Sequence, residues 1–251
     1  IPYPRLAVVQ CATFATGASG LVVGFWVPRW WPVFGSAGLL VASASLLCAN
    51  MWPMLRASPQ RGVAEVGLMV STGFLVVAAA LGMLLALDKS WSVLHGNVLT
   101  NLAAHAHLAA IGWVGLTIVA LSFRFLPAFL MPTVDLTPIA KRLVVALAVA
   151  VAVLATLLLV RSDVAWAAAG ALTALVLVYV GLVLRVVAHR RLPMDWTAWH
   201  AVAGVGWVTF AALTGVVLAW VGGDDLLGAR LAAAYGVAGI VGWMSNLIVG
   251  V

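Results

Sequence analysis

Apolar residues in this chain occur in long runs that are separated by short groups of charged and helix-breaking residues. A helix of about 20 residues crosses roughly 30 Å of hydrocarbon, because each residue adds about 1.5 Å. Eight runs reach that length: Leu6–Val27, Val33–Leu55, Ala64–Leu87, Leu99–Leu126, Leu143–Val160, Val164–Val187, Thr197–Val221 and Leu227–Val251. The alternating ten-residue strands of a membrane barrel are not found. The pattern therefore predicts an all-α, polytopic transmembrane helical bundle of about eight spans, forming a single domain over residues 1–251.

Composition agrees with a membrane protein and leaves no room for a separate soluble domain. The chain of 251 residues is 65% hydrophobic and 8% charged, with a mean hydropathy of +1.16. Soluble domains are nearer 25% charged. Cys11 and Cys48 both fall in apolar runs, so we expect buried free thiols rather than a disulfide. The chain begins without Met and stops inside an apolar run, so we expect it to be part of a longer protein.

The positions of lysine and arginine predict the orientation of the bundle. With eight spans, the side that holds the amino terminus (side B) collects nine basic residues and the opposite side (side A) collects four. Side B holds Arg5, Arg56, Arg61, Arg124, Lys141, Arg142, Arg185, Arg190 and Arg191, and side A holds Arg29, Lys89, Arg161 and Arg230. Cytoplasmic loops carry the excess of basic residues, so side B is predicted to face the cytoplasm. The net charge of +6 then indicates loop placement and lipid contact, not nucleic-acid binding.

Three of the five histidines lie within thirteen residues, at the start of the fourth span. Ionisable side chains at membrane depth are costly and mark binding sites by default, and imidazole binds haem iron and copper. His105 and His107 are two residues apart, which is a rotation of about 200° on an α-helix. They therefore face opposite ways and cannot both bind one metal ion from a regular helix. His95 lies nearer side A, beside the turn signal Gly96-Asn97.

Other polar residues extend this candidate site. His200 lies about one turn inside the seventh span, where it is a third candidate ligand or an interfacial residue among tryptophans. Arg29 and Arg161 lie on the same side as the paired histidines, so either could bind a haem propionate or a lipid phosphate. Glu65 opens the third span, where a carboxylate favours the helix dipole; a role in proton transfer is the alternative.

Three segments share a Gly-Trp pair, at Gly112-Trp113, Gly206-Trp207 and Gly242-Trp243. Small residues at these places let helix backbones approach closely. The pairs are compatible with an internal repeat, although two residues are weak evidence for one.

The fourth span also carries a family resemblance. His105-Ala106-His107-Leu108, then Gly112-Trp113-Val114, closed by Arg124-Phe125-Leu126-Pro127, resembles bacterial inner-membrane proteins related to catalytic subunit I of haem-copper oxidases, near the cbb3-type branch. The segment from Tyr235 to Asn246 is similar to a late helix of the same proteins. The resemblance covers the fourth to eighth spans. It implies a bundle that binds one or two b-type haems, with His105, His107 and His200 as matching metal ligands.

The resemblance implies an electron-transfer subunit of a larger respiratory complex in the bacterial cytoplasmic membrane, with cytochrome c, quinol or other redox subunits as partners. Oxidase activity is not expected, because a three-histidine copper site cannot be assembled from these residues. Two other classes stay open. One is a carrier or channel in which histidines line a polar path, and the other is a structural subunit without a cofactor.

Overall fold

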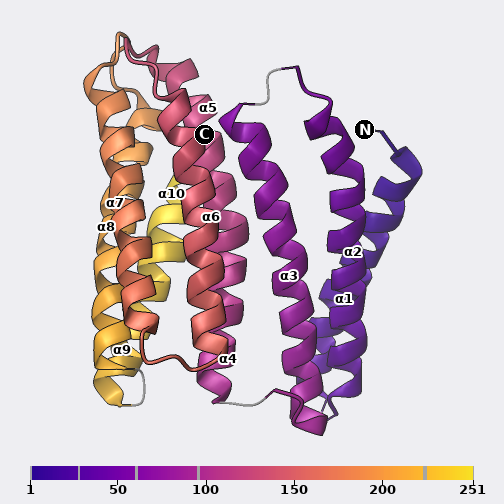
Figure 1. Ribbon diagram of the computed structural model, residues 1–251. Helices are drawn as coiled ribbons and strands as arrows, with labels where there is room; N and C mark the ends of the chain where they lie inside the picture. The colour runs from indigo at the N-terminus through magenta and orange to yellow at the C-terminus, as the bar shows by residue number, and fades with distance from the viewer. Residues whose placement is uncertain (1, 28, 60–61, 95–96, 223–224, 251) are drawn as a thin grey trace.

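The computed structural model describes residues 2–27, 29–59, 62–94, 97–222 and 225–250, and the described residues form helices and no strands (Figure 1). Eight helical segments among them are long and apolar enough to span a membrane. The predicted all-α, multi-pass bundle is therefore confirmed. The helices are α1 (Pro4–Trp26), α2 (Trp31–Arg56), α3 (Val63–Trp91), α4 (Val98–His107), η1 (Leu108–Gly115), α5 (Leu116–Leu130), α6 (Thr137–Leu159), α7 (Ala165–Ala188), α8 (Trp196–Val221), α9 (Leu226–Val237), η2 (Ala238–Met244) and α10 (Ser245–Val249).

The fifth span begins six residues earlier than the apolar pattern indicates, at Thr137 instead of Leu143. Asp135 accepts a hydrogen bond from the Thr137 backbone N–H at 2.9 Å, and Pro138 lies in the first turn, where its missing N–H costs nothing. Lys141 and Arg142 are therefore helical residues at the end of the bundle. Hydropathy alone had placed them in the preceding linker.

The fourth and eighth spans are each built from three consecutive helical segments. Span four runs α4–η1–α5 without a break, and span eight runs α9–η2–α10. The middle segments, η1 and η2, are π-helical. Such wide turns inside α-helices occur frequently at functional sites, because they redirect side chains and leave carbonyls less tightly paired. Each of the two π-helical segments contains one of the Gly-Trp pairs.

The core lies among spans four to eight, and the first helix is peripheral. Helices α6, α7, α8 and the eighth span follow one another around the span-four helices, while α3 covers the opposite side of span four, followed by α2 and α1 (Figure 1). The largest fully buried side chains apart from two serines of α2 and α3 all lie in spans four to six: Tyr179, Leu116, Leu130, Val144, Val151 and Val183. Residues of α1 are mostly exposed, and this corrects the prediction for Cys11, which is an exposed thiol. Cys48 is buried and free, as predicted.

The two halves of the chain repeat one four-helix arrangement. In the first half, Phe74 of α3 packs on Gly112 of η1, and His105 of α4 packs on Gly82 of α3. In the second half, Trp207 of α8 packs on Gly242 of η2, and Tyr235 of α9 packs on Gly215 of α8. The α3 residues precede their α8 counterparts by 133 positions, and the span-four residues precede their span-eight counterparts by 130. The structure thus supports the internal repeat that the Gly-Trp pairs indicated.

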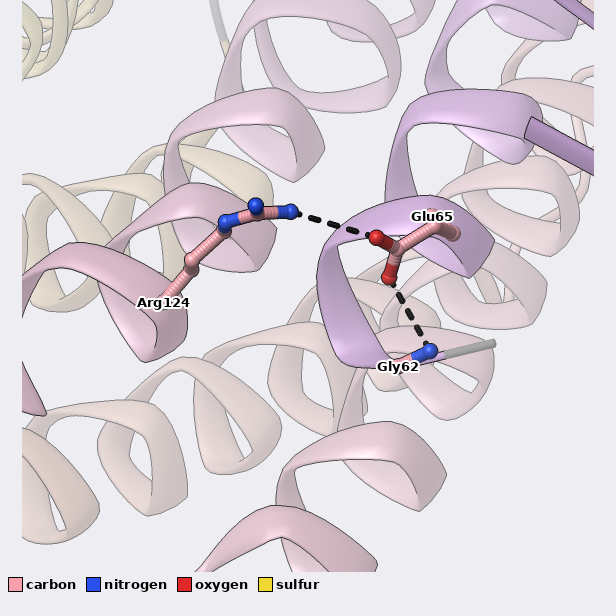
Figure 2. A network of polar contacts seen from close by, with 3 residues as sticks. All are labelled: Gly62, Glu65 and Arg124. Atoms are coloured by element: carbon pink, nitrogen blue, oxygen red, sulfur yellow. Dashed lines mark hydrogen bonds and ion pairs between the residues drawn. The ribbon is translucent and has the colours of Figure 1, made fainter. Parts of the chain in front are cut away.

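A polar network closes the side-B end of α3 (Figure 2). One carboxylate oxygen of Glu65 accepts a hydrogen bond from the Gly62 backbone N–H at 2.9 Å. The other lies 3.2 Å from the Arg124 guanidinium of α5. Glu65 therefore caps its own helix and ties it to span four, which is the helix-terminal role expected from the sequence.

Candidate functional site

A cavity of about 280 Å³ lies inside the ring of spans four to eight. Both π-helical segments line it, through Ala110 and Ile111 of η1 and Ile240 and Trp243 of η2. Its wall is mostly apolar, and no Asp, Glu, Lys or Arg lines it among the described residues. A charged molecule would leave water and gain no partner here, so the cavity is suited to an uncharged one.

His107 is the one predicted site residue among the side chains that line this cavity. Its Nδ1 lies 2.7 Å from the Ala103 carbonyl oxygen, which can only accept, so Nδ1 carries the proton and donates. Nε2 of the neutral ring is then an acceptor, and the Tyr235 hydroxyl lies 3.3 Å from it. The two rings are stacked, with centroids 5.9 Å apart and planes inclined by 24°. The backbone of span four thus fixes both the tautomer and the direction of the imidazole.

A second polar group lies on the cavity wall. Trp243 is 5% exposed, and its indole N–H interacts with the Tyr179 hydroxyl without reaching regular hydrogen-bond geometry. Its ring packs edge-on against Tyr179, with centroids 6.3 Å apart. The Tyr179 hydroxyl also pairs with Ser122 at 3.2 Å. Because the buried indole N–H is only weakly satisfied, a hydrogen-bond acceptor inside the cavity would stabilise this arrangement.

The cavity opens sideways between the fourth and eighth spans. Three of its lining residues, Ala106 of α4, Ala232 of α9 and Ile240 of η2, are exposed on the surface of the bundle. The two spans come closest further along, where Gly115 faces the Trp243 ring. Because this opening lies within the apolar spans, a molecule dissolved in the bilayer could enter it.

His105 faces away from the cavity, as its spacing from His107 predicted. Its Nδ1 donates to the Ala78 carbonyl oxygen of α3 at 3.0 Å, and its ring lies against Gly82. Span four therefore presents one imidazole to each side. His105 serves the α3–α4 contact in this structure.

His200 lies near the other end of the bundle. Its Nδ1 pairs with the Asn246 side-chain oxygen at 3.0 Å. Along α8 it is 15 residues from Gly215, which packs against Tyr235, and this corresponds to about 22 Å of helix. The structure does not bring His200 to the His107 cavity, so the two cannot bind the same iron atom.

Of the remaining predicted residues, His95 falls outside the residues that the structure describes. Arg29 and Arg161 are exposed in the α1–α2 and α6–α7 connections and do not line the cavity. His189 is exposed, and its Nδ1 donates to the Arg185 carbonyl oxygen.

The lining residues fit a haem poorly. Ligand pockets for drug-sized molecules measure roughly 300–1,000 Å³, and a haem is larger than most such molecules, whereas this cavity holds about 280 Å³. No basic side chain among the described lining residues could bind the propionates. The described residues also contain no group of three His, Cys, Asp or Glu side chains that could hold a metal ion.

Sequence reasoning missed the two aromatic partners of this site, Tyr235 and Trp243. The sequence contained one signal: when Gly112-Trp113 is aligned with Gly242-Trp243, Tyr235 falls at the position equivalent to His105. Nothing in the sequence shows that Tyr235 then meets His107 of the other half. No family model, curated protein or solved structure matches this chain.

Proposed function

We propose that this protein is a quinol-binding subunit of a membrane redox complex, and that its cavity takes the ring of a quinol from the bilayer. The observation that carries the proposal is the His107–Tyr235 pair in an uncharged, mostly apolar cavity that opens toward lipid. A quinol is neutral, lipid-soluble and flat, and its hydroxyl groups require a few well-placed polar partners.

The side chains supply those partners. The Nε2 atom of His107 accepts a hydrogen bond, here from Tyr235, and a ring hydroxyl can donate to the same atom. The Trp243 indole N–H is a buried donor without a hydrogen bond of regular geometry, and a ring oxygen could accept from it. His107 is also positioned to take a proton from a bound hydroxyl at Nε2, while its Nδ1–H remains hydrogen-bonded to the Ala103 carbonyl oxygen.

Binding of a short-chain quinol to the purified protein in nanodiscs tests this proposal. We expect titration calorimetry to show one site, and His107→Ala to weaken binding by about 5- to 150-fold, since each lost hydrogen bond to a buried group costs about 1–3 kcal/mol. Tyr235→Phe removes the hydroxyl that occupies Nε2, so it leaves that acceptor free for the ligand and should not weaken binding. His189→Ala, on the exposed end of α7, is the control and should bind as the parent protein does. Equal binding by parent and His107→Ala would refute the assignment.

Haem binding is a second candidate, favoured by one feature of His107. Imidazoles that ligate metals commonly donate their other ring N–H to a carbonyl, as Nδ1 does to Ala103. Because the present cavity fits a haem poorly, this candidate requires spans four and eight to separate. An absorption spectrum of the dithionite-reduced protein decides it, with a b-type α-band that His107→Ala abolishes. Absence of both the band and quinol binding would favour the structural subunit or the carrier.

A further inference from the structure

The internal repeat extends along the whole contact between the third and fourth spans of each half. Ser71 of α3 hydrogen-bonds to Thr117 of α5, and its counterpart Gly204 of α8 packs on Leu247 of α10, the counterpart of Thr117. Gly67 packs on Ala120 in the first half, and the counterparts His200 and Gly250 pack together in the second. With the two ring–glycine pairs already described, four successive contacts are equivalent, so surfaces can be compared between the halves residue by residue.

The first half docks on the second through a defined pair of surfaces. Its third and fourth spans pack against α6, the first helix of the second half. Val144 of α6 is fully buried there, beside Gly67 of α3. In the first half the docking side includes Val63 of α3, which lies one turn from Gly67 on the same helix face and is 6% exposed.

The equivalent surfaces at the two ends of the chain are open. On the second half, Trp196, the counterpart of Val63, is 83% exposed. Helix α6 follows α1 by 133 positions at both of its ends, so Cys11 and Phe14 of α1 are the counterparts of the buried Val144 and Leu147, and both are exposed. The second half thus lacks a neighbour against its last span, and the first half lacks a neighbour against α1.

We propose that a second copy of this chain joins the two open surfaces, with α1 of one copy against α8 and the eighth span of the other, as α6 packs on α3 and the fourth span. This contact between two copies is equivalent, by the repeat, to the contact between α3 and α6 within one chain. Both surfaces are apolar, and Cys11 and His200 both lie within two turns of the side-B ends of their helices, so they meet at one depth in the bilayer. The contact is heterologous: a pair of copies still has one open surface of each kind, so association closes into a ring or extends.

Disulfide trapping in native membranes tests the contact. By the repeat, Cys11 of one copy lies against position 200 of its neighbour, as Val144 lies against Gly67. We expect His200→Cys, and Ala203→Cys on the same helix face, to give oxidant-dependent covalent dimers and larger species. Cys11→Ser in the same background should abolish them. Cross-linking of the parent protein through Cys11 alone would instead show a symmetric α1–α1 pair and would overturn the proposal.

Native mass spectrometry gives a readout that needs no engineered thiol. We expect the parent protein to be oligomeric and Ala203→Trp, on the exposed His200 face of α8, to dissociate it, because the added bulk prevents close packing. Val178→Trp, on the exposed side of α7, is the matched control and should leave the oligomer intact. A monomeric parent protein in lipid, with open surfaces covered by lipid or by a further segment of a longer chain, would overturn the proposal.

Discussion

At the scale of single residues, glycines decide how closely the third and fourth spans of each half can approach. A Cβ atom on Gly242 would lie 2.5 Å from the Trp207 ring, and one on Gly112 would lie 2.8 Å from the Phe74 ring. Neither ring can shift freely, because each packs into a helix contact. The missing side chain is therefore part of the packing, as small residues commonly are between membrane helices.

Replacing one of these glycines should destabilise the bundle. We expect Gly242→Ala to lower the free energy of unfolding by about 1–3 kcal/mol, the usual cost of overpacking. Gly170→Ala on α7 is the matched control, because a Cβ there meets nothing within 4 Å and the change removes backbone freedom from the unfolded chain. Thermal unfolding in detergent should show a lower midpoint for the first variant and an unchanged or higher one for the second.

Asp135 offers a pH-dependent test at the start of α6, outside the membrane spans. Its hydrogen bonds with Thr137 lower the pKa of its carboxyl below the usual 3.8. A lowered folded-state pKa means that the cap contributes above the unfolded-state pKa and is lost as pH falls through the folded-state value. We expect a carboxyl ¹³C titration midpoint below 3.8, and Thr137→Pro, which removes both the side-chain hydroxyl and the backbone N–H that bond to Asp135, to raise it. An unchanged midpoint in that variant would assign the shift to another group.

At the scale of elements, hydropathy predicted where helices lie better than how they are built. Eight spans were expected and eight are present among the described residues, mostly within one to four residues at each end. The π-helical segments were not predicted, because no residue in Leu108–Gly115 breaks the apolar pattern. The same limit applies to the site. The opposite faces of His105 and His107 follow from helix geometry, whereas the meeting of His107 with Tyr235 depends on how two distant spans pack.

The contribution of the Glu65 cap at the start of α3 to the stability of the bundle can be measured. Glu65→Ala removes the cap on Gly62 and the contact with Arg124, so we expect about 1 kcal/mol of lost stability. Arg124 is 61% exposed at its side chain, which makes the ion pair alone worth less. Arg124→Gln should therefore cost well under 1 kcal/mol in the same thermal unfolding assay. Equal losses in both variants would show that the pair, not the cap, stabilises this end of α3.

At the scale of the whole molecule, the order of the helices determines at which of the two ends of the bundle each connection lies. Both the amino terminus and the α5–α6 connection lie at side B, and the α6–α7 connection lies at side A (Figure 1). Large exposed tryptophans, among them Trp26, Trp31 and Trp220, lie at helix ends, as expected where a bundle meets the lipid headgroups. The basic excess on side B predicts which of these ends faces the cytoplasm.

Cysteine labelling in intact cells tests that orientation. In a background with Cys11→Ala and Cys48→Ala, Asp163→Cys places an exposed thiol in the α6–α7 connection and Asp135→Cys places one in the α5–α6 connection. We expect a membrane-impermeant maleimide to label the first in intact cells and the second only after permeabilisation. The opposite pattern would reverse the bundle and bring the His107 cavity nearer the cytoplasmic face, because His107 lies only about 14 Å of helix from the side-A start of α4. The quinol or haem proposed for that cavity would then have to exchange protons or electrons with partners in the cytoplasm.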